Sequence, residues 1–197
     1  MKFPPHARPI TTLALAFALF GLEACLPAEA DYRFGLGTSE IVGIVDTDGG
    51  APDPAKVLIV IFQHHYLFET VGGQEKVYRV SAALNEVDRH GRFVVHMPSD
   101  VVTLELLFIA PDRLTEEFKF NRQIGIGQVS YRASLEHHPN WHAHFYTYLQ
   151  PMLSHLIVEP RYQMSLEDQK RLGDWLLFEN ARLDDLRRER AAKWEAS

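Results

Sequence analysis

The 197-residue sequence predicts an α+β protein that is mainly β, with a β-sandwich followed by a C-terminal extension of two helices. Short apolar segments separated by Gly, Pro and Asp occupy residues 40–124, which is typical of a small sandwich. The apolar residues then change to helical spacing within residues 125–197. Ahead of both lies a short apolar run that ends next to Cys25, the only cysteine. We therefore expect a signal peptide over residues 1–24, an N-terminal linker over 25–39, the sandwich over 40–124 and the helical extension over 125–197.

The leader is typical of an export signal. Lys2 and Arg8 precede an apolar run over residues 10–22 (ITTLALAFALFGL), which is shorter than the roughly 20 residues that a membrane-spanning helix needs. The segment Leu22-Glu23-Ala24-Cys25 resembles the lipobox of bacterial lipoproteins, in which the thiol is lipidated and the preceding residues are removed. The resemblance implies that Cys25 is the lipidation site. With Leu26 after it, it also implies an anchor in the outer membrane that faces the periplasm.

Two features of the leader leave other mature forms open. Glu23 lies where a lipobox usually has a small or apolar residue, and Ala28-Glu29-Ala30 is an A-x-A cleavage site. Cleavage after Ala30 would leave a soluble periplasmic or secreted chain, and an uncleaved anchor is the third form. Neither cleaved form can close an internal disulfide, because at most one thiol remains. Stability must then come from the hydrophobic core of about 170 residues.

The chain is acidic, with 26 Asp and Glu against 20 Lys and Arg and a net charge of −6. Removal of the leader makes the mature chain more acidic still. No basic face is evident that would neutralise phosphates, so we exclude nucleic acid as a partner.

The expected strands follow one another along the first half of the mature chain. Residues 40–46 lead to the turn signal Thr47-Asp48-Gly49-Gly50. Residues 56–63 (KVLIVIFQ) form a continuous apolar run, as in a strand buried on both faces. The remaining expected strands span residues 77–84, 92–97, 101–110 and, as an edge strand, 114–124.

Several of these segments resemble the carboxypeptidase regulatory-like domain. The matching motifs are Gly43-Ile44-Val45-Asp46, Gly50-Ala51-Pro52, the Val-rich strand, the hairpin Asp88-Arg89-His90-Gly91-Arg92-Phe93, and Pro98. They cover residues 40–111, under half of the chain. The resemblance implies a transthyretin-like, immunoglobulin-like sandwich. Because that domain is an accessory module and not a peptidase centre, it implies no catalytic residue.

Two amphipathic helices are expected after the strands. In residues 139–159 one apolar stripe predicts a helix with a kink or a restart at Pro151; the stripe consists of Trp141, Phe145, Tyr148, Leu149, Met152, Leu153 and Leu156. A second helix begins at the capping motif Ser165-Leu166-Glu167-Asp168 and is expected to fray over residues 186–194. The two helices would cover one sheet face or bind a partner.

Histidines and aromatic residues near the first helix give two candidate binding sites. His137, His138 and His142 could hold copper or zinc through imidazole nitrogens, provided that the loop before the helix folds against His142. Trp141, Phe145 and Tyr146 could contact a partner, although the helical spacing of Trp141 and Phe145 favours the core.

No coherent catalytic set is visible in the sequence. There is no G-x-S-x-G motif, and serines near the histidines in sequence, Ser130 and Ser134, do not define a triad. We therefore expect a protein that is not an enzyme and has no cofactor. The expected function is that of a lipid-anchored accessory or interaction protein of the cell envelope, which reaches an envelope partner through its helical extension. The alternative is a periplasmic copper- or zinc-binding protein.

Overall fold

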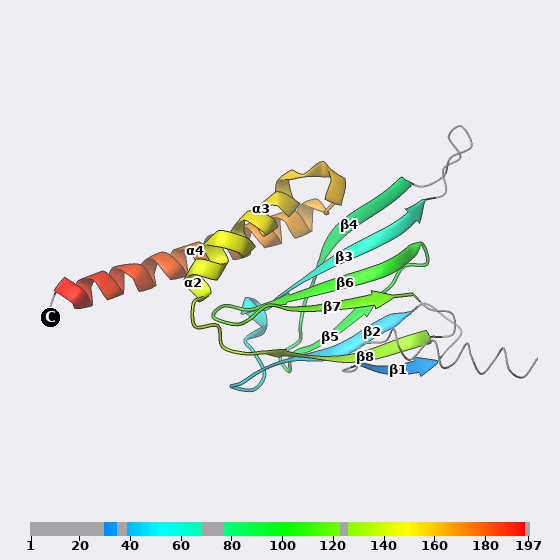
Figure 1. Cartoon of the computed structure of the whole chain (residues 1–197), viewed down its shortest axis with the longest axis horizontal. Helices are drawn as coiled ribbons and strands as arrows, with labels where there is room; N and C mark the ends of the chain where they lie inside the picture. Colours follow the sequence, from blue (N-terminus) through cyan, green and yellow to red (C-terminus); the bar gives the residue numbers. More distant parts are fainter. Residues whose placement is uncertain (1–29, 35–38, 68–76, 123–125, 196–197) are drawn as a thin grey trace, which may run out of the picture. The chain divides into compact units, whose positions relative to one another are not determined.

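The computed structural model describes residues 30–34, 39–67, 77–122 and 126–195 (Figure 1). The predicted signal peptide and Cys25 lie outside the described residues. The chain divides into two units, Met1–Ala30 and Asp31–Ser197. None of the helices in the described part of the chain is long and apolar enough to cross a membrane.

Two four-stranded sheets make up the described part of the sandwich, which confirms the predicted fold class. The first sheet has the order β1 (Ala30–Phe34), β8 (Ile126–Leu135), β2 (Glu40–Thr47) and β5 (Arg92–His96). The second sheet has the order β4 (Val77–Asn85), β3 (Leu58–Leu67), β6 (Val101–Ile109) and β7 (Glu116–Asn121). Its three pairings are antiparallel, whereas β2 pairs in parallel with β8. As predicted, β7 is an edge strand.

Strand β8 corrects the predicted end of the sandwich at residue 124. Residues 126–135, which the sequence assigned to the helical extension, lie in the first sheet beside β2. Tyr131, Ala133 and Leu135 are buried, while Arg132 and Ser134 between them are exposed, and this period of two is that of a strand with one buried face. Strand β1 likewise lies within the predicted linker.

Aromatic rings join the inner faces of the two sheets. Phe108 of β6 lies 5.2 Å from Phe93 of β5 and 5.8 Å from Tyr131 of β8, measured between ring centroids. Tyr131 also stacks on Phe118 of β7 at 4.1 Å. Contacts of this kind add to the free energy gained by burying the ring areas.

The other face of the second sheet is covered by the helical extension (Figure 1). Leu58 and Val60 of β3 pack there against α2 (Trp141–His144), α3 (Gln150–Val158) and α4 (Leu166–Glu195). Their neighbours Ile59 and Ile61 are buried on the opposite face. The apolar run of β3 is therefore buried on both faces, as predicted. Short 3-10 helices, Pro54–Lys56 and Pro160–Tyr162, lie before β3 and α4.

The helix that contains α2 and α3 widens between them into a π-helical segment, Phe145–Leu149. The backbone N–H of Gln150 donates to the carbonyl of Phe145, five residues earlier. Pro151 has no N–H, and its ring would clash with the carbonyl four residues before it in a regular helix, so the wider turn accommodates it. The helix therefore continues through Pro151.

The extra residue in the π-helical turn also explains a wrong assignment in the predicted stripe. Tyr148 is 66% exposed, whereas Tyr146, expected to be the better exposed of the two, is partly buried against the core. The other stripe residues are covered by the sandwich and α4. The predicted stripe is therefore part of the core and not a bare surface.

Helix α4 begins as predicted and ends differently. The hydroxyl of Ser165 accepts a hydrogen bond from the N–H of Asp168, which caps the helix. The helix then continues to Glu195, so the predicted fraying over residues 186–194 is wrong. Residues 187–195 are all exposed.

Candidate functional site

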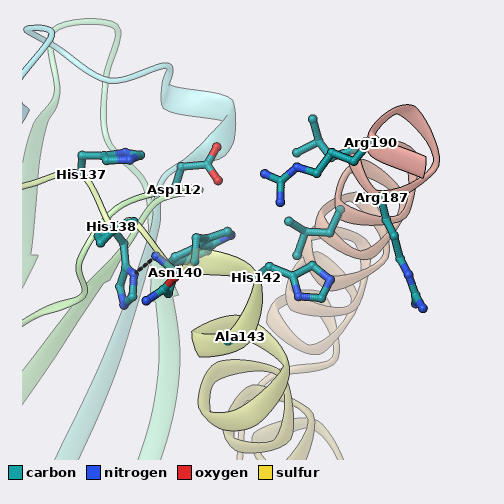
Figure 2. Close-up of a pocket in the computed structure, with 12 residues that line it drawn as sticks. Asp112, His137, His138, Asn140, His142, Ala143, Arg187 and Arg190 are labelled. Atoms are coloured by element: carbon teal, nitrogen blue, oxygen red, sulfur yellow. Dashed lines mark hydrogen bonds between the residues drawn. The ribbon is translucent and has the colours of Figure 1, made fainter. Parts of the chain in front are cut away.

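A pocket of about 490 Å³ lies where the loop between β8 and α2 faces α4 (Figure 2). Its residues come from three places: Asp112 from the turn after β6, residues 137–143 from the β8–α2 loop and α2, and Leu183, Leu186, Arg187 and Arg190 from α4. The pocket brings together segments that lie far apart in the sequence.

Backbone hydrogen bonds fix the loop that forms one wall of the pocket. The N–H of His138 donates to the carbonyl of Asp112 at 2.8 Å, and the N–H of Leu114 donates to the carbonyl of Glu136 at 2.7 Å. Asp112 has φ of 61°, a left-handed conformation that Asp tolerates better than most residues. The turn after β6 thus holds the histidine-containing loop in place through backbone hydrogen bonds.

An ion network around one buried carboxylate adjoins this wall, and we call it the Glu179 network: Glu179, Arg182, Asp112 and Trp141. Glu179 is fully buried, and both of its carboxylate oxygens accept hydrogen bonds from Arg182. Arg182 also donates to both oxygens of Asp112, at 2.7 and 3.0 Å. The indole N–H of Trp141 donates to Glu179 as well. The hydrogen bonds to Glu179, followed by those to Asp112, raise the pKa of Arg182, which therefore remains charged.

The pocket is cationic although the chain as a whole is acidic. Arg187 and Arg190 are exposed on α4, and neither forms an ion pair with another residue in the described part of the chain. Asp112 is the only carboxylate among the lining residues, and Arg182 already engages both of its oxygens. Figure 2 shows Asp112 and Arg190 facing each other across the opening, with Arg187 extending outward from the rim.

The three predicted metal-binding residues, His137, His138 and His142, all line the pocket. Within the described residues, however, no group of three or more His, Cys, Asp or Glu is placed to hold a metal ion. Nδ1 of His138 accepts a hydrogen bond from the N–H of Asn140. Figure 2 shows His137 and His142 on opposite sides of the opening. The structure thus gathers the predicted histidines without directing them at one point.

His144, on the same helix, stacks on the ring of His138 with 4.8 Å between centroids. Burial lowers its pKa, and the proximity of His138 lowers it further. His144 therefore favours the neutral form more strongly than an exposed histidine does.

The predicted contact residues lie mainly in the core. Trp141 and Phe145 are buried in the cluster between the second sheet and the helices, so neither presents a surface to a partner. Tyr146 is partly buried against the same cluster, and its pKa is raised by burial and then by the charges of Asp184 and Glu179. The lipidation prediction at Cys25 lies outside the described residues.

Sequence reasoning missed the Glu179 network and both pocket arginines. One signal was present, because Glu179 lies three residues after Leu176 and four before Leu183, on the apolar stripe of α4. A carboxylate at such a position needs a buried partner. Which partner it finds depends on the turn after β6, and helical spacing carries no information about that turn.

No family model matches the chain, and no curated protein matches it. The resemblance to the carboxypeptidase regulatory-like domain therefore stays a prediction.

The solved structures that the chain matches include three dioxygenases. The 3-chlorocatechol 1,2-dioxygenase of Rhodococcus opacus 1CP is 13% identical with a TM-score of 0.35, over 54% of this chain and 62% of that one. The dioxygenase domain of a dioxygenase and carbohydrate-binding fusion from Streptomyces sp. SirexAA-E is 13% identical with a TM-score of 0.31, over 52% and 82%. Hydroxyquinol 1,2-dioxygenase of Pseudomonas putida DLL-E4 is 10% identical with a TM-score of 0.32, over 64% and 73%. The chain thus spans about three fifths of the length of the chlorocatechol enzyme.

These neighbours correct one expectation. The chain was expected not to be an enzyme, and the solved structures named above are all dioxygenases, so that expectation is withdrawn. At these identities and TM-scores the likeness assigns no activity and no cofactor to this chain.

Proposed function

We propose that the chain is a lipid-anchored accessory protein of the cell envelope, which binds an acidic segment of an envelope partner in the pocket between the β8–α2 loop and α4. The observation that carries the proposal is the cationic lining of this pocket in an acidic chain. Cys25 supplies the anchor, and the helical extension presents the pocket.

The charges of the lining favour a carboxylate ligand. Guanidinium groups bind carboxylates through paired hydrogen bonds, and Arg187 and Arg190 lie three residues apart on α4, on neighbouring positions of one helix face. The exposed side chains of His137 and His142 add further donors. A volume of about 490 Å³ is within the range of ligand pockets and admits a few side chains of a peptide.

The alternative ligand is copper or zinc, held by His137, His138 and His142. The two arginines at the rim repel a divalent cation, and the three rings would have to turn toward a common point. The charge of the pocket therefore favours the acidic segment over the metal ion.

Titration of the mature protein with a fluorescently labelled peptide of glutamates tests the pocket. We expect binding that weakens as salt is added, because exposed charges are screened within about 8–10 Å at physiological salt. The double variant Arg187→Glu/Arg190→Glu replaces two attractive contacts by repulsive ones. Since each exposed contact contributes up to about 1 kcal/mol, we expect affinity to fall by roughly ten- to thirtyfold.

The matched control is Arg188→Glu, on the same helix. Arg188 is exposed and pairs with Asp185, and it does not line the pocket. The control changes the net charge by half as much as the double variant does. A control that loses half or more of the binding free energy lost by the double variant would show that only the net charge matters, and would remove the pocket from the proposal. Tight binding of copper or zinc that is lost in His138→Ala/His142→Ala would favour the metal alternative.

The anchor has an independent test. Cells fed a labelled fatty acid are expected to label the wild-type chain, and the Cys25→Ser variant is expected to carry no label. An unlabelled wild type, or equal label on both chains, would overturn the anchor and leave the pocket untouched.

A further inference from the structure

A second polar cluster lies away from the pocket, at the end of β3 in the second sheet. Nδ1 of His65 lies 2.8 Å from a carboxylate oxygen of Asp100, and Nε2 of the same ring lies 2.8 Å from the hydroxyl oxygen of Ser81. The imidazole thus bridges a carboxylate and a hydroxyl, one on each ring nitrogen. We call these three residues the Ser81 triad.

Three separate segments bring the triad together. His65 lies near the end of β3, Ser81 lies on the neighbouring strand β4, and Asp100 lies in the turn directly before β6. Ser81 pairs with Gln63 in the antiparallel register, and side chains two residues apart point to one face. His65 and Ser81 therefore share a face of the sheet.

The contact with Asp100 orients the imidazole for proton transfer. A carboxylate accepts only from a protonated nitrogen, so Nδ1 carries the hydrogen and Nε2 of the neutral ring is left to accept the proton of Ser81. The hydrogen bond from His65 lowers the pKa of Asp100, with a smaller contribution from the charge of Arg79. Asp100 therefore stays ionised.

Burial differs along the triad. His65 is only 8% exposed, while Ser81 is partly exposed. The single proton of this hydroxyl has two acceptors within reach, Oε1 of Gln63 at 3.2 Å and Nε2 of His65 at 2.8 Å, and the shorter contact assigns the proton to His65. The base is thus held in a fixed position, and Ser81 is the less buried member of the pair.

A cationic side chain lies on the same face. Arg79 pairs with His65 in the register and lies two residues before Ser81. Its buried Nε has no hydrogen-bond partner within the described residues. A guanidinium at this place is suited to stabilise negative charge on an oxygen that develops beside Ser81.

We propose that Ser81, His65 and Asp100 form a catalytic site that hydrolyses esters of carboxylic acids. The site is distinct from the pocket, and its activity goes beyond the proposed binding function. Ser81 is the nucleophile and His65 the general base, while Asp100 is a positioning residue that acts through His65.

The reaction balances with water as the only co-substrate. Oγ of Ser81 forms a bond to the acyl carbon while its proton passes to Nε2 of His65. The bond from that carbon to the alkoxy oxygen then breaks, and His65 returns the proton to the leaving alcohol. In the second half, water gives a proton to His65 and its oxygen attacks the acyl carbon. The bond to Oγ breaks, Oγ takes the proton, and the carboxylic acid leaves.

A fluorophosphonate probe tests the nucleophile in the purified mature protein. Oγ displaces fluoride from phosphorus, so a reactive serine becomes covalently labelled. We expect a label on Ser81 that disappears in Ser81→Ala, and hydrolysis of p-nitrophenyl acetate that disappears with it. The matched control Ser134→Ala, an exposed serine on β8, is expected to label like the wild type.

The other two members separate catalysis from a purely structural network. His65→Gln is expected to slow labelling about 100-fold or more, the range that general-base catalysis contributes. Asp100→Asn keeps the shape but not the charge. It is expected to slow labelling as well and to shift its pH profile, which a merely structural role would not do. An unlabelled wild type, a label on another serine, or labelling of His65→Gln at the wild-type rate would each overturn the proposal.

Discussion

The Glu179 network and the Ser81 triad each join side chains from distant segments, yet they end differently. In the Glu179 network the buried carboxylate of Glu179 accepts hydrogen bonds from Arg182 and Trp141, and Asp112 accepts two more from Arg182. In the Ser81 triad the chain of hydrogen bonds ends on a partly exposed hydroxyl.

This difference is the one we expect between a structural cluster and a reactive one. The Glu179 network contains more charged groups and a more deeply buried carboxylate, but its hydrogen bonds hold no nucleophile next to a base that could remove its proton. The triad has less charge and more exposure, and its terminal hydroxyl shares its proton with a base. The position of the last proton is therefore a better guide to chemistry than the depth of burial.

The largest effect is expected from Glu179→Ala. The substitution removes the two hydrogen bonds that Arg182 donates to Glu179 and leaves the indole N–H of Trp141 without its acceptor. Removing one partner of a buried ion pair costs about 3–5 kcal/mol, and the remaining contact of Arg182 with Asp112 places the loss at the lower end of this range. Urea unfolding followed by circular dichroism measures the loss. Glu189→Ala, at an exposed position of the same helix, is the control and is expected to change stability by less than about 0.5 kcal/mol. Similar effects of the two variants would show that the network does not stabilise the fold.

A smaller effect on stability is expected from Ser81→Ala. The variant loses the hydrogen bond that one partly exposed hydroxyl donates to His65, which contributes about 0.5–1.5 kcal/mol. The same unfolding experiment therefore places Ser81→Ala well below Glu179→Ala, although it is expected to abolish labelling by the probe. A loss as large as that of Glu179→Ala would indicate that the triad is a structural cluster like the first.

The smallest effect is expected from acid. Because the hydrogen bond from His65 lowers the pKa of Asp100 below its ordinary value of 3.8, the unfolded chain takes up this proton first as the pH falls. The contribution of Asp100 to stability is therefore complete above pH 3.8 and is lost as the pH falls through the lowered pKa. Since the side chain of Asp100 is 57% exposed, solvent screens the interaction and the loss is small.

Urea midpoints measured on both sides of this interval detect that loss. Asp100→Asn is expected to lose less stability on acidification than the wild type does. Identical losses would show that the contact with His65 does not persist in solution.

The sandwich was largely predictable because strand signals are local. The run of β3 and the turn after β2 are visible in the sequence, and both lie where they were predicted. Strand β8 was missed although its alternation is local, because the histidines and aromatic residues that follow it favoured a helical interpretation of the whole region. Its parallel pairing with β2 joins residues that are far apart in the sequence.

The sites were less predictable than the fold. His137, His138 and His142 are close in sequence and do face one pocket, but their rings do not converge. His65, Ser81 and Asp100 are widely spaced and meet only because β3 pairs with β4 and the turn before β6 lies beside them. The register of the strands determines which of these side chains come into contact, and short-range sequence patterns do not encode that register.

The π-helical segment before Pro151 contains one residue more than a regular helical turn, and this extra residue sets how α2 at the pocket is rotated relative to α3 in the core. Each residue turns an α-helix by about 100°, so removing the extra residue, for example by deleting Thr147, would restore regular winding and rotate α2 against α3 by about that angle. Leu153 and Leu156 would keep their places against the second sheet, while Trp141 would leave Glu179 and His142 would leave the pocket. One residue inserted in one helical turn thus sets the phase between the part of the helix that packs and the part that lines the site.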